Sequence, residues 1–263
     1  MPRPKRWTPT KFEYGMQEFE LSSWRYFADF VTAELLDYPQ FIYRGQASSG
    51  YLLEPTLDRA LRLRGKVTSR LARQRHLNNF RFAARGRRGS NPARIDDDNE
   101  WWALGQHQGL ATPLLDWTTS PYVAAYFAFE DQPREAASRR AVFAIDVNAF
   151  DERSKEISKA HSGNARPPIV EFVRPMQDEN ARLVSQGGLF TRAPDGTDIE
   201  AWVRQHFPQG YEDIVLLKIT LPSADRALAL RGLNRMNINR ASLFPDLAGA
   251  SAFCNLALET DKY

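Results

Sequence analysis

The pattern of apolar and polar positions predicts both helices and short strands in the first third of the chain. Apolar residues recur at helical spacing from Trp24 to Leu35, and Pro39 ends that helix. Residues 40–46 contain a β-branched and aromatic run that is closed by a glycine, which predicts a strand. Residues 57–85 carry apolar side chains on a strongly basic background and are predicted to be helical.

The rest of the chain continues without a regular alternation of strands and helices. The predicted strands, rich in apolar and β-branched residues, cover residues 141–147, 169–173, 189–191 and 214–221. The predicted helices, marked by N-cap residues and apolar spacing, cover residues 99–107, 121–129, 178–183, 197–206 and 238–258, the last of them broken at residues 244–249. Another helix starts at Ser223. Because a doubly wound sheet needs regular alternation, the sequence predicts an α+β fold.

The domain organisation predicted from composition is simple. Residues 1–11 are mostly polar and basic, and residues 1–20 are predicted to form a flexible N-terminal arm. Residues 21–263 are predicted to form one compact domain. A basic helical insertion occupies about residues 59–98 of this domain, and its most loop-like part is residues 85–98. The order of that loop is left open by the sequence.

Charge is distributed unevenly along the chain. The formal net charge is +3, too small to mark the whole molecule as a nucleic-acid binder. However, the segment from Arg59 to Arg94 contains twelve basic residues and no acidic one. This segment is either a solvated helix face or a phosphate-attracting surface that recruits a nucleic-acid or protein acceptor.

The cellular compartment is predicted from what the sequence lacks. The only cysteine, Cys254, has no partner for an intramolecular disulfide, which favours a reducing compartment. The N-terminus has no apolar signal core, and no apolar run approaches the roughly 20 residues that span a bilayer. We therefore expect a cytoplasmic protein with no membrane association.

The segment from Trp101 to Phe129 is predicted to carry the functional site. It begins apolar and aromatic, brings His107, Asp116 and three hydroxyl groups close together in sequence, and ends in an apolar helix. Polar groups in such surroundings are partly desolvated, so they must find hydrogen-bond partners or take part in chemistry.

Several common site signatures are absent. The sequence contains no GxxxxGK[ST] phosphate loop, no GxGxxG turn after a strand, no HExxH and no GxSxG elbow. The four histidines are far apart, with no Cys or His at metal-ligand spacing. No metal site is predicted.

Arg44 and His107 are the first two candidate site residues. Arg44 lies in an otherwise apolar strand and needs a partner because its guanidinium stays charged. That partner is either a buried carboxylate such as Asp116 or the phosphate of a ligand, with Gly45 letting the ligand approach the backbone. His107 is either structural, or a donor to a ligand or a general acid–base group.

The densest polar cluster is residues 116–120. Ser120 can be simply the N-cap of the following helix, and Trp117 can fill the core or stack on a ring. An Asp with apolar neighbours either pairs with an arginine or has a raised pKa, and both situations are typical of functional sites. Gln186, followed by two glycines, forms either a plain turn or a contact with a ligand.

Tyr43-Arg44-Gly45-Gln46 and the run from Gln106 to Pro121 resemble the FRG-domain family, whose N-terminal motif is Phe/Tyr-Arg-Gly. Later segments, at residues 180–190 and 242–249, are also similar to blocks of that family. The resemblance covers about residues 25–250. It implies little biochemistry, because the family is largely uncharacterised.

A second, weaker resemblance is to ADP-ribosyltransferases of the Arg–Ser–Glu type. Arg44 matches the arginine that holds NAD in those enzymes, and residues 118–120 match the Ser-Thr-Ser strand with Thr in the first place. The catalytic Glu has no counterpart, because Gln186-Gly187-Gly188 stands at that point. The carboxylates that would have to replace it are Asp116, Glu171 or Asp246.

This second resemblance implies an NAD-binding, ADP-ribosyltransferase-like enzyme with a small, split, mixed or antiparallel sheet surrounded by helices. Arg44 would hold the pyrophosphate, His107 would contact a ribose or the amide, and Asp116 would orient Arg44 or stabilise positive charge. The residues implied to bind NAD are Tyr43, Arg44, Gly45, Gln46, His107, Thr118, Ser120 and Gln186. A role in bacterial defence or a toxin system fits such an enzyme.

Two alternatives remain open at this point. The first is a catalytically inactive module of the same fold that senses a nucleotide or another ligand. The second is a metal-dependent nuclease, which needs two or more carboxylates converging on a metal. The substrate, the acceptor and the oligomeric state are not determined by the sequence.

Overall fold

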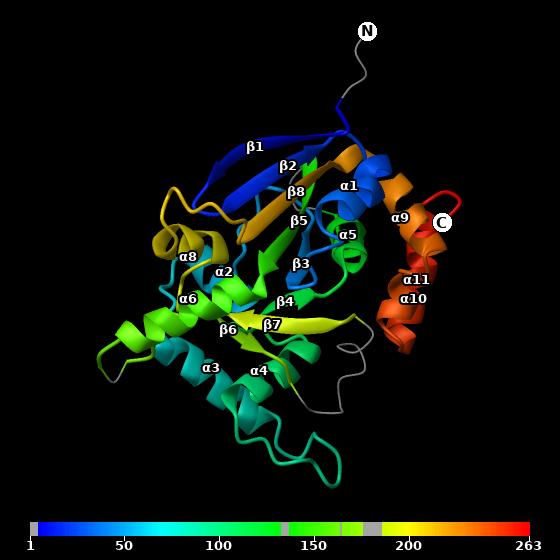
Figure 1. Cartoon of the computed structure of the whole chain (residues 1–263). Coiled ribbons are helices and arrows are strands. Elements are labelled where there is room, and N and C mark those ends of the chain that lie inside the picture. Colours follow the sequence, from blue (N-terminus) through cyan, green and yellow to red (C-terminus); the bar gives the residue numbers. More distant parts are fainter. Residues whose placement is uncertain (1–4, 133–136, 164, 176–185) are drawn as a thin grey trace.

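The structure is a computed structural model, and it describes residues 5–132, 137–163, 165–175 and 186–263. These residues form a single α+β domain in which one eight-stranded mixed sheet is flanked by ten α-helices (Figure 1). The predicted α+β class is confirmed.

The strands follow the order β1-β2-β8-β5-β3-β4-β7-β6 across the sheet. Their bounds are β1 (Trp7–Glu13), β2 (Met16–Leu21), β3 (Phe41–Gln46), β4 (Leu115–Thr118), β5 (Arg139–Asp146), β6 (Glu171–Val173), β7 (Gly188–Arg192) and β8 (Leu216–Pro222). β2 and β8 run parallel, and every other neighbouring pair is antiparallel.

The helices are distributed over both faces of the sheet. Their bounds are α1 (Phe27–Glu34), α2 (Thr56–Leu63), α3 (Arg70–Ala83), α4 (Asp98–His107), α5 (Pro121–Glu130), α6 (Val147–Ala160), α8 (Ile199–His206), α9 (Arg226–Arg235), α10 (Arg240–Leu243) and α11 (Leu247–Glu259). One apolar core lies between one face of the sheet and the helices α1, α5, α9, α10 and α11. A second core lies between the other face and the helices α6 and α8. A third, smaller cluster joins α2, α3 and α4 to β6 and β7.

The predicted flexible arm is wrong for residues 7–20, which belong to the hairpin of β1 and β2. Tyr14 and Gly15 form its two-residue turn with positive φ values of 56° and 71°, as a tight hairpin requires. Most side chains of β1 are exposed because β1 is an edge strand. The polar composition of this strand therefore reflects its position at the edge and not a lack of structure.

Two further predictions on the path to the site need correction. The predicted helix over residues 57–85 is two helices, α2 and α3, separated by residues 64–69. No strand is predicted between residues 107 and 121, but residues 115–118 form strand β4 between β3 and β7. The predicted helix over residues 178–183 lies outside the described residues.

The start of the central helix α5 is as predicted. Ser120 is the N-cap and its hydroxyl accepts the backbone N–H of Val123 at 3.3 Å, while Pro121 occupies the first turn. At the other end, Arg140 donates to the carbonyls of Ala128 and Asp131, and Arg226 donates to those of Phe129 and Glu130. Two arginines thus satisfy carbonyl groups that the end of a helix leaves unpaired.

The predicted small, split sheet is wrong, because the eight strands form one continuous sheet. The connection between β3 and β4 is its weakest point. β3 pairs with β5 over six residues, whereas it pairs with β4 through one residue pair, Tyr43 and Thr118. The two strands therefore separate beyond that pair, and the next residue of β3 is Arg44. In the part of the chain that the structure describes, no helix is long and apolar enough to cross a membrane.

Candidate functional site

The site is built around Arg44, at the point where β3 and β4 separate. Its neighbour on one side, Tyr43, lies in the core with α1 and α5, and Ile42 lies in the core on the opposite face. Because side chains alternate along a strand, Arg44 points to the same face as Ile42. The separation of the strands gives its guanidinium room to reach the backbone of β4.

Asp116 is the partner of Arg44. Arg44 Nη1 donates to the backbone carbonyl of Asp116 at 2.8 Å and lies 3.5 Å from carboxylate oxygen Oδ2. The Arg44 side chain is 19% exposed and that of Asp116 is 60% exposed. The pair therefore lies at the edge of the core, with the carboxylate facing solvent. Among the described residues, Asp116 is the carboxylate that forms an ion pair with Arg44.

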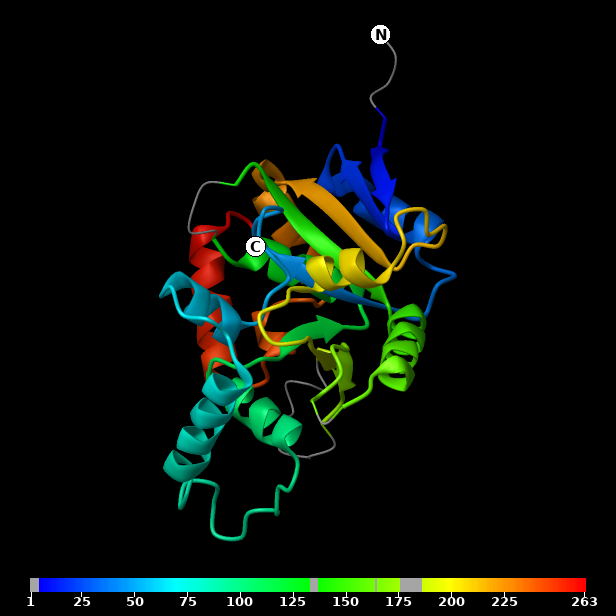
Figure 2. The ribbon, with the colours of Figure 1, turned by 90° about the vertical axis from the view of Figure 1, so that its left-hand side faces the viewer.

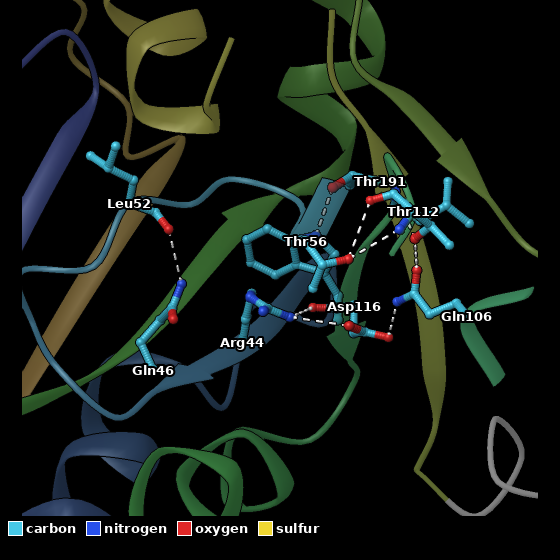
Figure 3. Close-up of polar contacts among 10 residues, drawn as sticks. Arg44, Gln46, Leu52, Thr56, Gln106, Thr112, Asp116 and Thr191 are labelled. Carbon is cyan, nitrogen blue, oxygen red and sulfur yellow. Dashed lines mark hydrogen bonds and ion pairs between the residues drawn. The ribbon is translucent and has the colours of Figure 1, made fainter. Parts of the chain in front are cut away.

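A chain of hydrogen bonds holds the Asp116 carboxylate from the other side (Figure 3). Gln106 Nε2 donates to Asp116 Oδ1 at 2.6 Å, and Gln106 Oε1 accepts from the hydroxyl of Thr112. Thr112 is fully buried, and its backbone N–H donates to the hydroxyl of Thr56 at 3.1 Å. The network thus connects β3 and β4 with the last turn of α4 and the start of α2.

The positive charge of Arg44 is only partly compensated by its surroundings. Burial lowers the pKa of its guanidinium, Asp116 raises it, and the nearby cation of Arg59 lowers it again. The Nε atom of Arg44 is buried and has no hydrogen-bond partner among the described residues. Since arginine stays protonated in proteins, this environment favours the approach of an additional anion.

The residues next to Arg44 have structural surroundings. A Cβ at Gly45 would lie 1.9 Å from the carbonyl oxygen of Ala124 and 2.5 Å from the backbone nitrogen of Ala128, so α5 occupies the space beside this glycine. Burial raises the pKa of Tyr43 to about 12. The contacts of Tyr43 and Gly45 with NAD stay a prediction. Position 45 requires a glycine because α5 packs against it.

Gln46 is also buried, and its Nε2 donates to the carbonyl of Leu52 at 3.3 Å. This hydrogen bond fixes the connection that leads from β3 to α2 (Figure 3). Gln46 therefore helps to position α2, the helix that carries Arg59.

A second group of predicted residues meets at the other end of β4. The hydroxyl of Thr118 donates to the carbonyl of Gln186 at 2.6 Å and accepts the backbone N–H of Ser120 at 3.1 Å. Gln186 Nε2 donates to the carbonyl of Leu243 at 3.1 Å. The structure thus brings Thr118, Ser120 and Gln186 together and ties them to α10, one residue pair away from Arg44.

The remaining candidates are less directly connected to Arg44. His107 is the last residue of α4 and partly buried, and it follows Gln106, which reaches Asp116. Trp117 lies in the core and donates through Nε1 to the hydroxyl of Thr191 at 2.8 Å, so the core interpretation of this residue holds. Of the alternative carboxylates, Glu171 pairs with Arg166 and Asp246 caps α11.

Sequence reasoning missed four members of the site, namely Gln106, Thr112, Thr56 and Arg59. One feature of the sequence indicates the contact between Gln106 and Asp116. These residues lie on either side of Gly109, whose positive φ allows the chain to turn between α4 and β4. Arg59 could not be singled out among the twelve cations of its segment.

Residues 39–137 match the family model described as the FRG domain. This segment is an FRG domain. No curated protein and no solved structure matches the chain. The resemblance to ADP-ribosyltransferases therefore has no support from these comparisons and stays a prediction.

The network around Arg44 lies entirely within the FRG domain, because its most distant members are Arg44 and Asp116. The second group depends on Gln186 and Leu243, which lie beyond the matched segment. Among the described residues, no group of three or more His, Cys, Asp and Glu is placed to hold a metal ion. The Arg44 network is thus the candidate site of the FRG domain itself.

Proposed function

We propose that this chain binds the phosphates of a nucleotide at Arg44, with NAD as the first candidate, and that it cleaves or transfers ADP-ribose from it. The observation that carries the proposal concerns the largely buried guanidinium of Arg44. Among the described residues it forms hydrogen bonds through Nη1, whereas its Nε has no partner.

The unused donors of Arg44 have the geometry that phosphates need. A guanidinium has five N–H groups in a planar fork, and its parallel donors suit two oxygens of one phosphate. Arg59 lies close enough to affect the pKa of Arg44, so a pyrophosphate placed here would meet two cations. A bound dianion would relieve the repulsion between these cations, which favours phosphate over a neutral ligand.

Asp116 is the residue that can give this site a reaction. In NAD cleavage, the bond between the nicotinamide nitrogen and ribose C1 breaks, and nicotinamide leaves with the bonding electron pair. The positive charge left on the ribose is stabilised by a nearby carboxylate, until water or an acceptor attacks C1 and loses a proton. Asp116 lies beside Arg44 and is more than half exposed, so it can serve this role while Gln106 holds its other oxygen.

A specific alternative is a sensor that binds the nucleotide without cleaving it. Both Asp116 oxygens already have partners, since Oδ1 accepts from Gln106 and Oδ2 faces Arg44. A carboxylate engaged in this way has less capacity to stabilise a developing cation. This observation favours the sensor over the nuclease, for which the described residues offer no cluster of carboxylates.

The test compares Arg44→Gln and Asp116→Asn by calorimetry with NAD and by the release of free nicotinamide. We expect Arg44→Gln to weaken NAD binding by about 10- to 150-fold, the value of a hydrogen bond to a charged group. Asp116→Asn should retain binding and lose nicotinamide release. Retained binding with no release by the unaltered protein would instead establish the sensor.

The control separates binding from folding. Arg25→Gln removes an exposed cation that has no carboxylate partner among the described residues, so NAD affinity should be unchanged. Arg44→Met should leave the free energy of unfolding within about 1 kcal/mol, because it replaces a poorly compensated buried cation by an apolar chain. Loss of folding in Arg44→Met, or equal NAD affinity in all variants, would contradict the proposal.

A further inference from the structure

We propose a second binding site, for single-stranded nucleic acid, on the basic lobe formed by residues 59–97. Arg59, at the start of the lobe, belongs to the Arg44 site. The second site uses the cations from Arg64 onward and does not depend on the proposed function. Figure 2 shows this part of the chain, drawn in cyan to teal at the lower left, extending from the body of the molecule. Helix α3 forms its length and the connection from α3 to α4 forms its tip.

Most cations of the basic lobe are not neutralised by the protein. Arg62, Arg73, Arg81 and Arg94 have carboxylate partners. Those without one among the described residues are Arg59, Arg64, Lys66, Arg70, Arg75, Arg85, Arg87 and Arg88. Apart from Arg59, which lies near Arg44, they are found between α2 and α3, on α3, and directly after it. Such a concentration of free positive charge attracts a polyanion.

The exposed face of α3 suits a phosphate backbone better than a lipid surface. Leu71, Arg75, Asn78 and Phe82 follow helical spacing and are all exposed. The two apolar side chains on this face are eleven residues apart, which is about 16 Å along a helix. Between them lie polar side chains that donate hydrogen bonds, so the face has no continuous apolar strip to enter a membrane.

Phe82 supplies the feature that selects unpaired bases. It is 70% exposed, and the guanidinium of Arg85 covers one face of its ring at 3.8 Å from the centroid. A ring backed by a cation and open to solvent can stack on a base, and stacking of this kind tolerates any base. In a duplex the bases are already stacked on one another, which favours a single strand at this position.

A hollow lined in part by Arg85, the residue whose guanidinium covers the Phe82 ring, can receive part of the strand. It has a volume of about 370 Å³ and is lined by Arg81, Arg85 and Arg88 together with Trp101. Arg81 and Arg88 lie over the Trp101 ring at 5.5 and 5.1 Å. This volume is within the range of sites for small ligands, and it allows one nucleotide to enter with its phosphate among the arginines.

The test measures the fluorescence anisotropy of a labelled 20-nucleotide oligothymidylate with the full chain between 50 and 200 mM salt. The lobe variant combines Arg75→Gln, Arg85→Gln and Arg87→Gln. Each lost phosphate contact lowers the slope of log affinity against log salt by about 0.7 for a single strand, so we expect a decrease of about 2. Phe82→Ala should weaken binding at least fivefold with an unchanged slope.

The matched control combines Arg25→Gln, Lys159→Gln and Arg235→Gln, which removes the same charge from exposed positions outside the lobe. This control should retain the affinity and slope of the unaltered chain. The proposal would be overturned by absence of oligonucleotide binding, or by equal losses in the lobe and control variants. It would also be overturned if the three lobe substitutions left oligothymidylate binding unchanged and weakened only the binding of the chain to phosphatidylserine vesicles or to an acidic peptide.

Discussion

Gly45→Ala is expected to lower the free energy of unfolding by about 3 kcal/mol or more, at the upper end of the range for overpacked cores. The added methyl group would lie 1.9 Å from the carbonyl oxygen of Ala124. The atoms in the way belong to the backbone of α5, so a side-chain rotation cannot relieve the clash. For a chain of this size, the melting temperature should fall by about 6–12 °C.

The control for this prediction is Gly210→Ala, because no heavy atom lies within 4 Å of the added Cβ there. Thermal unfolding of both variants followed by circular dichroism measures the difference. If Gly45 mattered only for the approach of a ligand, Gly45→Ala would melt like the unaltered chain and lose NAD binding alone. That result would refute the packing role assigned to this glycine.

Arg73→Met is expected to destabilise the protein by about 3–5 kcal/mol, since it leaves a buried carboxylate without its cation. Arg73 is 2% exposed and contacts Asp58 at 2.5 Å and Asp195 at 2.7 Å. Asp58 is itself buried, so water cannot replace the lost partner. These contacts dock α3 against α2 and against the segment after β7.

A second substitution tests the cause of that loss. Replacing both partners, as Arg73→Met with Asp58→Leu, should recover much of the stability because no buried charge remains unpaired. Arg94→Met is the comparison, since Arg94 contacts Asp96 at 2.7 Å and both side chains are mostly exposed. It should lower the free energy of unfolding far less than Arg73→Met does. Urea unfolding of the three variants would decide; equal losses for Arg73→Met and Arg94→Met would contradict the assignment.

The sequence predicted elements whose signal is local. The N-cap of α5 follows from Ser120-Pro121, and the strands β3, β5 and β8 follow from their apolar runs. In each case the residues that determine the element are also the residues that form it. The α+β class could be predicted for the same reason.

The elements that were missed depend on distant partners. β1 has few buried side chains and is held by its pairing with β2, so its composition resembles that of a loop. β4 is short and gains its partners from β3 and β7, which lie far from it in sequence. Pairing of this kind leaves almost no pattern in the strand itself.

The candidate site shows the same division between residues with a local signal and residues that depend on distant partners. Arg44 and Asp116 could be named as possible partners because each is a charged residue among apolar ones. Gln106 and Thr112 are ordinary polar residues, and their connection to Asp116 exists only after α4 packs against β4. The role of Gly45 also needed the structure, because the atoms of α5 that require a glycine are about 80 positions away.

The position of β8 has a consequence for the growing chain during translation. β8 lies between β2 and β5, and it begins at residue 216, long after both neighbours have been synthesised. Until then, the nascent polypeptide carries two strands with open hydrogen-bonding edges, and the middle of β5, residues 141–145, is entirely apolar. Vectorial synthesis therefore leaves the middle of the sheet incomplete until β8 emerges, and during this interval both open edges can pair with other chains.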